Sequence, residues 1–157
     1  MSRLDHVTDS RPLASVGYAN FTLNTDMAAR LRAAGVESLI DVRALASSRR
    51  RGFAKTALSS ALADRGIEYV HMRALGNPKA GRELYRRGAI EEGRALFERH
   101  LLGEQRGALE ELARLIAQRH CALMCVEADP ALCHRTAIID ALRSELGLAL
   151  EVTEISP

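Results

Sequence analysis

An uninterrupted apolar run at residues 121–126 is the sequence feature that most constrains the fold. A strand that is apolar at every position is typical of a sheet covered on both faces, because neither side of it is left for water. The chain has 157 residues, 47% of them hydrophobic, which is enough to bury such a sheet between two layers of helices. We therefore expect a single α/β domain over residues 1–157, with residues 1–11 as a flexible N-terminal segment.

Further apolar runs alternate with helix-compatible segments along the chain. Strands that alternate with helices imply right-handed crossovers and a mainly parallel sheet. The predicted fold is a Rossmann-like, three-layer α/β sandwich with a mainly parallel sheet of about five strands. The pattern predicts strands at residues 13–17, 38–43, 67–72, 121–126 and 148–155, helices at residues 24–34, 55–65 and 132–146, and two or three more helices between residues 79 and 120.

The apolar stretches and the cysteines of the chain indicate the cellular compartment in which it works. No apolar stretch approaches the roughly 18 to 20 residues of a membrane helix, and the N-terminal residues lack the apolar core of a signal peptide. The three cysteines all lie between Cys121 and Cys133 and do not form the framework of a small secreted domain. We expect a cytoplasmic protein with reduced thiols and no membrane partner, and the oligomeric state stays open.

Ligands of such sheets bind beyond the carboxyl ends of the strands, so the residues that follow each predicted strand are the candidate site. An aromatic ring there can stack on a base or sugar, and arginines make forked contacts to phosphate. Their joint character predicts an anionic or sugar-like ligand, although a loop-filling tyrosine and a solvated arginine explain part of the set equally well. The candidate binding residues are Tyr18, Asp41, Arg43, Ser48, Arg49, Asn77 and Arg135.

Several motifs together resemble the domain-of-unknown-function family four-eighty-eight, a group of uncharacterised bacterial proteins. The resemblance covers nearly the whole chain, and its most specific element is the Glu-Ala-Asp-Pro…Cys-His-Arg string. Ala46 departs from the pattern, since a proline is expected there. The resemblance implies a compact α/β fold with a shared pocket and supplies no reaction. The motifs are Val16-Gly17-Tyr18, Asp41-Val42-Arg43 followed by Ser48-Arg49-Arg50, Leu75-Gly76-Asn77-Pro78, and the segment from Cys125 to Arg135.

Glu127 and His134 are the predicted catalytic acid and base. Glu127 follows a buried strand, where burial and a neighbouring arginine tune the pKa of a carboxyl group. His134, at a helix start, is placed to share proton transfer or to hold a leaving group. Each residue also has a structural explanation: an ion pair with arginine for Glu127, and a hydrogen bond to the loop for His134.

Cys125 and Cys133 are possible reactive thiols. Cys133 is expected near a helix start, which favours a thiolate, but the sequence favours a buried, inert cysteine that packs the helix on the sheet. A cysteine that ends a strand is also similar to the rhodanese and cysteine-phosphatase arrangement. Here Ala131 stands where that anion cradle needs an arginine, and the loop is acidic and has no glycine. Cysteine-based sulfur or phosphoryl transfer is therefore the third hypothesis.

Metal binding is not favoured by the cysteine spacing. Cys121 and Cys125 are four residues apart on a strand, which separates them by about 13 Å, too far to share one zinc ion. Cys125, Cys133 and His134 stay conceivable as ligands, but no CxxC pair marks a zinc site. We predict no metal and no cofactor.

The sequence favours two classes of function over the cysteine-based hypothesis. In one, the protein binds or processes a phosphorylated, nucleotide-like or nucleic-acid ligand, and Arg43, Arg49 and Arg135 position the anion. In the other, it is a non-catalytic nucleic-acid-binding module that uses the basic segments Arg49–Lys55 and Lys79–Arg87. An aromatic content of 4% without tryptophan disfavours a stacking platform for single strands. Whether the protein is an enzyme stays open.

Overall fold

The computed structural model describes residues 10–157, which are built around one five-stranded sheet. The strand order is β3-β2-β4-β1-β5 and every pairing is parallel. This confirms the predicted α/β class and the parallel sheet. Residues 1–9 of the segment predicted as flexible lie outside the described residues, and Arg11 already begins a strand. The strands are β1 (Arg11–Gly17), β2 (Ser38–Asp41), β3 (Glu68–His71), β4 (Cys121–Cys125) and β5 (Leu150–Ile155).

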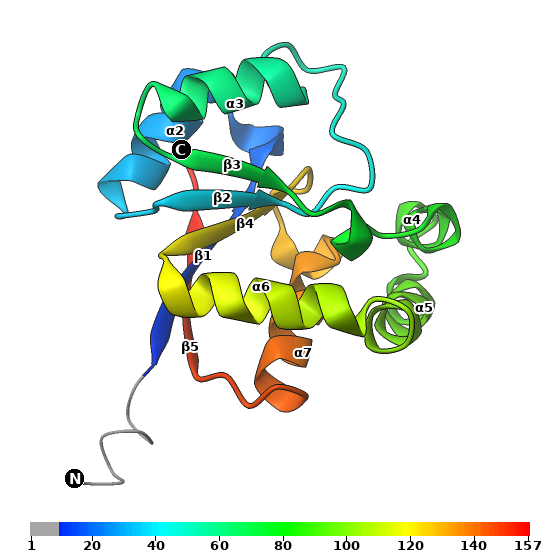
Figure 1. Cartoon of the computed structure of the whole chain (residues 1–157). Helices are drawn as coiled ribbons and strands as arrows, with labels where there is room; N and C mark the ends of the chain where they lie inside the picture. Colours follow the sequence, from blue (N-terminus) through cyan, green and yellow to red (C-terminus); the bar gives the residue numbers. More distant parts are fainter. Residues whose placement is uncertain (1–9) are drawn as a thin grey trace, which may run out of the picture.

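Helices cover both faces of this sheet and make three layers (Figure 1). On one face lie α2 (Asn24–Ala33) and α3 (Lys55–Ala63), and on the other lie α5 (Ile90–Leu102), α6 (Arg106–Gln118) and α7 (Arg135–Ser144). The apolar side chains form one buried cluster per face. Met27, Leu31 and Leu58 belong to the first cluster, and Phe97, Leu112 and Ile138 belong to the second.

Strand β4 lies between β1 and β2, and all of its residues are buried. Cys121, Leu123 and Cys125 enter the cluster under α5, α6 and α7, whereas Ala122 and Met124 enter the cluster under α2 and α3. The strand is apolar throughout because its side chains alternate between two buried layers.

Helix α4 (Lys79–Arg86) packs against α5 instead of covering the sheet. It follows β3 and the short helix η2 (Arg73–Leu75), and it lies on the side of the molecule where β2 and β3 end (Figure 1). A basic helix is thereby brought beside the carboxyl edge of the sheet.

The helix predicted at residues 132–146 begins at Arg135 instead. A short helical turn, η3 (Pro130–Leu132), precedes it, because the Asp129 carboxylate accepts a hydrogen bond of 2.9 Å from the amide of Ala131. Cys133 is then extended (φ −136°, ψ 148°), so it lies outside the helix whose N-terminus was expected to favour its thiolate. Among residues 10–157, no helix has both the length and the apolar character to span a bilayer.

Candidate ligand pocket at the strand ends

A pocket of about 520 Å³ opens beyond the ends of β2 and β4. Three segments line it: the loop after β2, the region of α4, and the loop between β4 and α7. They meet because parallel strands place the segments that follow them at one edge of the sheet. The lining residues are Arg43, Ala44, Leu45 and Ser47 from the first segment, Asn77, Arg82, Tyr85 and Arg86 from the second, and Cys125, Val126, Glu127, Leu132, Cys133 and His134 from the third.

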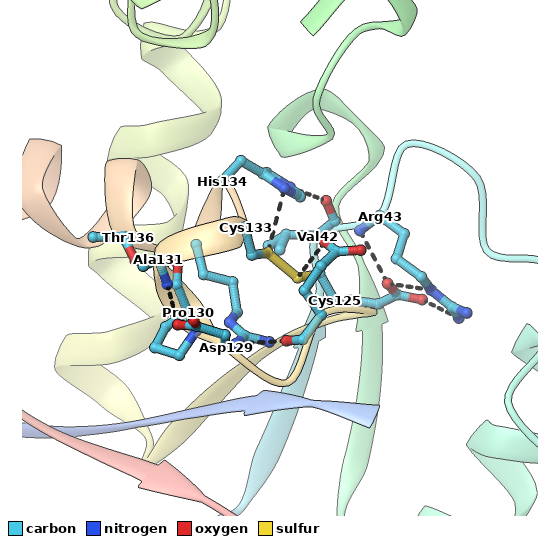
Figure 2. The surroundings of a disulfide bond; sticks show 12 residues. Val42, Arg43, Cys125, Asp129, Pro130, Ala131, Cys133, His134 and Thr136 are labelled. Carbon is cyan, nitrogen blue, oxygen red and sulfur yellow. Dashed lines mark hydrogen bonds and ion pairs between the residues drawn. A yellow bond between two sulfur atoms is a disulfide. The ribbon is translucent and has the colours of Figure 1, made fainter. Parts of the chain in front are cut away.

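Cys125 and Cys133 form a disulfide in the pocket wall (Figure 2). The sequence led us to expect reduced thiols; the structure joins two of the three cysteines instead, because the turn at η3 brings the extended Cys133 back to the end of β4. Cys121 is buried and unpaired, and burial raises the pKa of its thiol to about 11. The disulfide thus lies at the pocket, whereas the free thiol of Cys121 is buried in the sheet.

His134 lines the pocket but is only 7% exposed. Its Nε2 lies 2.7 Å from the carbonyl oxygen of Val42, and because a carbonyl only accepts, Nε2 carries the proton. Burial, together with nearby Arg135 and Arg82, lowers the pKa of His134 to about 4, against the opposing effect of the Val42 hydrogen bond. The imidazole is thus neutral near pH 7, and its unprotonated Nδ1 lies 3.7 Å from Cys133 Sγ (Figure 2).

Glu127 is half-buried in the same wall. Its Oε1 lies 3.8 Å from Cys125 Sγ. Burial raises the pKa of its carboxyl group, although Arg135 and a backbone hydrogen bond act in the opposite direction. Burial therefore favours the protonated form of Glu127 more than water does.

Arg43 also lines the pocket, but its guanidinium is already engaged. It donates to both carboxylate oxygens of Asp41, at 2.9 and 2.7 Å, and to the carbonyl of Phe53 at 2.8 Å. Asp41 also accepts a hydrogen bond of 2.5 Å from the hydroxyl of Tyr69. The Asp41–Arg43 pair thus fixes the loop after β2 and leaves little donor capacity for a ligand.

Arg135 is fully buried and is not in the pocket lining. Its Nη2 donates to the carbonyl of Glu127 at 3.0 Å and pairs with Glu154 at 3.3 Å. A Cβ atom at Gly17 would lie 1.6 Å from the same Glu127 carbonyl oxygen. The loop after β4 is therefore held from beneath by Arg135 and packs directly on the end of β1.

Tyr18, Ser48 and Arg49 lie outside the pocket lining. Tyr18 is buried, stacks on Phe53 with ring centroids 4.7 Å apart, and donates a hydrogen bond of 2.8 Å to Ser48 Oγ. Arg49 is exposed on the loop. Of the residues singled out in the sequence, the structure brings together Arg43, Asn77, Cys125, Glu127, Cys133 and His134.

Arg82 and Arg86 are lining residues that were not among the sequence-predicted site residues. They lie one turn apart on α4, and neither forms an ion pair within the described part of the chain, although Arg82 donates to the carbonyl of Asn77 at 3.0 Å. Their signal was present as the basic segment Lys79–Arg87, which we assigned to a possible nucleic-acid surface. The packing of α4 turns part of that segment toward the pocket.

Cys125, Cys133 and His134 also form a possible metal-binding group, since their ligand atoms lie within 4.8 Å of one another. Zinc and related metals bind thiolates. In this structure both sulfurs are joined to each other, so the group as it stands offers the imidazole alone as a ligand of that kind.

A protein-family model described as "Domain of unknown function DUF488" matches residues 25–142. This range contains every residue that lines the pocket. No curated protein and no solved structure matches the chain.

Proposed function

The chain belongs to the DUF488 family, whose description assigns no activity, and we propose from its pocket that it binds a small phosphorylated ligand there. The observation that carries the proposal is the pair Arg82 and Arg86, two guanidinium groups one turn apart in the lining without an acidic partner among the described residues. Planar guanidinium groups make paired hydrogen bonds to phosphate oxygens.

The other lining residues leave this positive charge largely uncompensated. The charge of Arg43 is balanced by Asp41, and His134 is neutral near pH 7. Glu127 is the acidic residue of the lining, and its raised pKa increases the fraction that carries no charge. The pocket therefore favours an anion, with Asn77 beside Arg82 as a further polar contact.

We propose Glu127 as the residue that gives a proton to this ligand. A half-buried carboxyl group with a raised pKa holds its proton closer to neutral pH, which suits a general acid. His134 has its Nε2–H committed to Val42, so it acts only as an acceptor, through Nδ1. Glu127 is therefore the proposed proton donor, and neutral His134 serves only as a proton or hydrogen-bond acceptor.

An extended polyanion such as nucleic acid is the second candidate, because exposed arginines of the segment Arg49–Lys55 follow the lining loop in sequence, and the segment Lys79–Arg87 itself contributes lining residues. Binding of this kind would depend steeply on salt concentration and would need charges outside the pocket as well. Arg49 and Arg51 therefore distinguish the two candidates: nucleic-acid binding needs these exposed charges, and binding of a small phosphorylated ligand does not.

Calorimetric titration with pyrophosphate tests the proposal. The wild-type chain should bind it, and the double variant Arg82→Gln/Arg86→Gln should bind at least about tenfold more weakly, since each charge-assisted hydrogen bond contributes about 1.5–3 kcal/mol. The control Arg49→Gln/Arg51→Gln removes two exposed charges outside the lining and should bind like wild type. Wild-type affinity in the Arg82/Arg86 variant would refute anion binding in the pocket. Loss of pyrophosphate binding in the Arg49/Arg51 control alone would favour the nucleic-acid surface.

A further inference from the structure

We propose that Cys125 and Cys133 form a thiol–disulfide exchange site that reacts with an external thiol admitted through the pocket. The disulfide lies in the pocket wall, and a proton-active side chain stands beside each sulfur. Glu127 Oε1 is 3.8 Å from Cys125 Sγ, and His134 Nδ1 is 3.7 Å from Cys133 Sγ. A disulfide that only cross-linked the fold would need neither group.

The pocket controls access to the disulfide. Cys125 and Cys133 are 2% and 3% exposed, and both belong to the pocket lining. A small thiol that enters the pocket can reach the sulfurs, whereas the surface of a large folded protein cannot enter a cavity of about 520 Å³. The co-substrate is therefore a low-molecular-weight thiol.

The positions of the protons decide which sulfur leaves first. The single ring proton of neutral His134 is on Nε2, where Val42 holds it, so this side chain has no proton to give to Cys133. Glu127 Oε1 lies 3.8 Å from Cys125 Sγ, and because burial raises the pKa of this carboxyl group, its protonated form can give a proton to Cys125. Attack therefore falls on Cys133 and expels Cys125.

The reaction then balances in two steps. A thiolate RS⁻ attacks Cys133 Sγ, the disulfide bond breaks, and the Cys125 thiolate takes a proton from Glu127, leaving a mixed disulfide on Cys133. A second thiolate attacks the R sulfur of the mixed disulfide and releases RSSR, and the Cys133 thiolate takes a proton from solvent. Two external thiols are oxidised, the protein disulfide is reduced to two thiols, and the Cys133 thiol donates a hydrogen bond to His134 Nδ1.

Arg82 and Arg86 give this site a preference among thiols. Because they lie in the same lining, a thiol that carries carboxylate or phosphate groups should react faster than a neutral one. This preference rests on the proposed anion-binding function, whereas the exchange itself does not.

The test follows the reduction of the oxidised full-length chain by mercaptosuccinate, which is anionic, and by 2-mercaptoethanol, which is neutral. Samples are quenched by alkylation, and the modified cysteines are identified by mass spectrometry. We expect Cys125 and Cys133 to become alkylated together, the pair to re-form reversibly with the corresponding disulfide oxidant, and mercaptosuccinate to react faster at equal thiolate concentration. Failure of the pair to form, or tight retention of a metal by the two thiolates in its place, would overturn the exchange site.

Two variants separate the roles. Glu127→Gln removes the proton donor with little change of shape and should slow reduction about tenfold or more, whereas Glu83→Gln, which removes an exposed carboxylate of α4, should react like wild type. An unchanged rate in Glu127→Gln would overturn its role. Equal rates with both thiols would count against anion binding and leave the exchange site standing. Absence of exchange together with intact pyrophosphate binding would overturn the exchange site and leave anion binding standing.

Discussion

The Nε2 atom of His134 lies 2.7 Å from the carbonyl oxygen of Val42, and this hydrogen bond joins the residue before α7 to the residue after β2. Two walls of the pocket are thereby fastened to each other, since the loop after β2 and the loop after β4 both line it. The same bond fixes the tautomer that leaves Nδ1 facing Cys133.

Acid should destabilise the protein through His134. The pKa of this residue falls from 6.5 to about 4 on folding, so between these values the unfolded chain binds a proton that the native chain does not. Stability is therefore lost as pH falls through this window, by about 3 kcal/mol in all. Urea unfolding at pH 7 and pH 4 measures the loss. The drop in the free energy of unfolding between pH 7 and pH 4 should be smaller by that amount in His134→Gln and unchanged in His120→Gln. Equal drops in the wild-type chain and both variants would show that His134 is not the cause.

Gly17→Ala should destabilise the fold because its Cβ would lie 1.6 Å from the carbonyl oxygen of Glu127. Backbone cannot yield as a flexible side chain can, so we expect a loss of about 3 kcal/mol or more in the free energy of unfolding. Gly107→Ala, on α6, is the matched control, since among residues 10–157 nothing beyond its chain neighbours and its own helix backbone lies within 4 Å of the added Cβ. Because Gly107 lies in the first turn of α6, alanine there should be neutral or stabilise by less than about 1 kcal/mol. Chemical denaturation measures both, and a Gly17→Ala chain as stable as the control would contradict the packing described.

Asp41→Asn should be costly because it leaves the guanidinium of Arg43 buried without its counter-charge. Breaking a buried pair on one side typically costs about 3–5 kcal/mol, whereas losing an exposed pair costs about 1 kcal/mol or less. Glu98→Gln, which removes the partly exposed pair with Arg94 on α5, supplies the comparison. Similar unfolding midpoints for the two variants would mean that the Asp41–Arg43 pair does not hold the loop.

Much of the fold could be predicted from residue pattern. The apolar run that contains Cys121 and Cys125 predicts a strand covered on both faces, and β4 is such a strand. The three-layer arrangement follows from the alternation of strands and helices. The error at α7 arose because apolar periodicity was extended through residues 132–134, whereas Asp129 and Pro130 stop the helix from starting there by forming η3.

The site was less predictable, for physical reasons. Asp41 and Arg43 suggested a ligand contact, but residues two apart in an extended segment lie on the same side and can satisfy each other. Arg82 and Arg86 show the spacing of a helix face, yet their distance from the strand ends depends on how α4 packs against α5. Tertiary packing of that kind leaves little trace in the local sequence.

Amide chemical-shift mapping during a pyrophosphate titration tests the central claim most directly, namely that a phosphorylated ligand occupies the pocket beside α4. We predict saturable shifts confined to residues 43–47, 77–86 and 125–134, the three segments that line the pocket. Shifts that do not saturate, or that concentrate at residues 49–55 and leave Arg82, Arg86 and Glu127 unchanged, would contradict it.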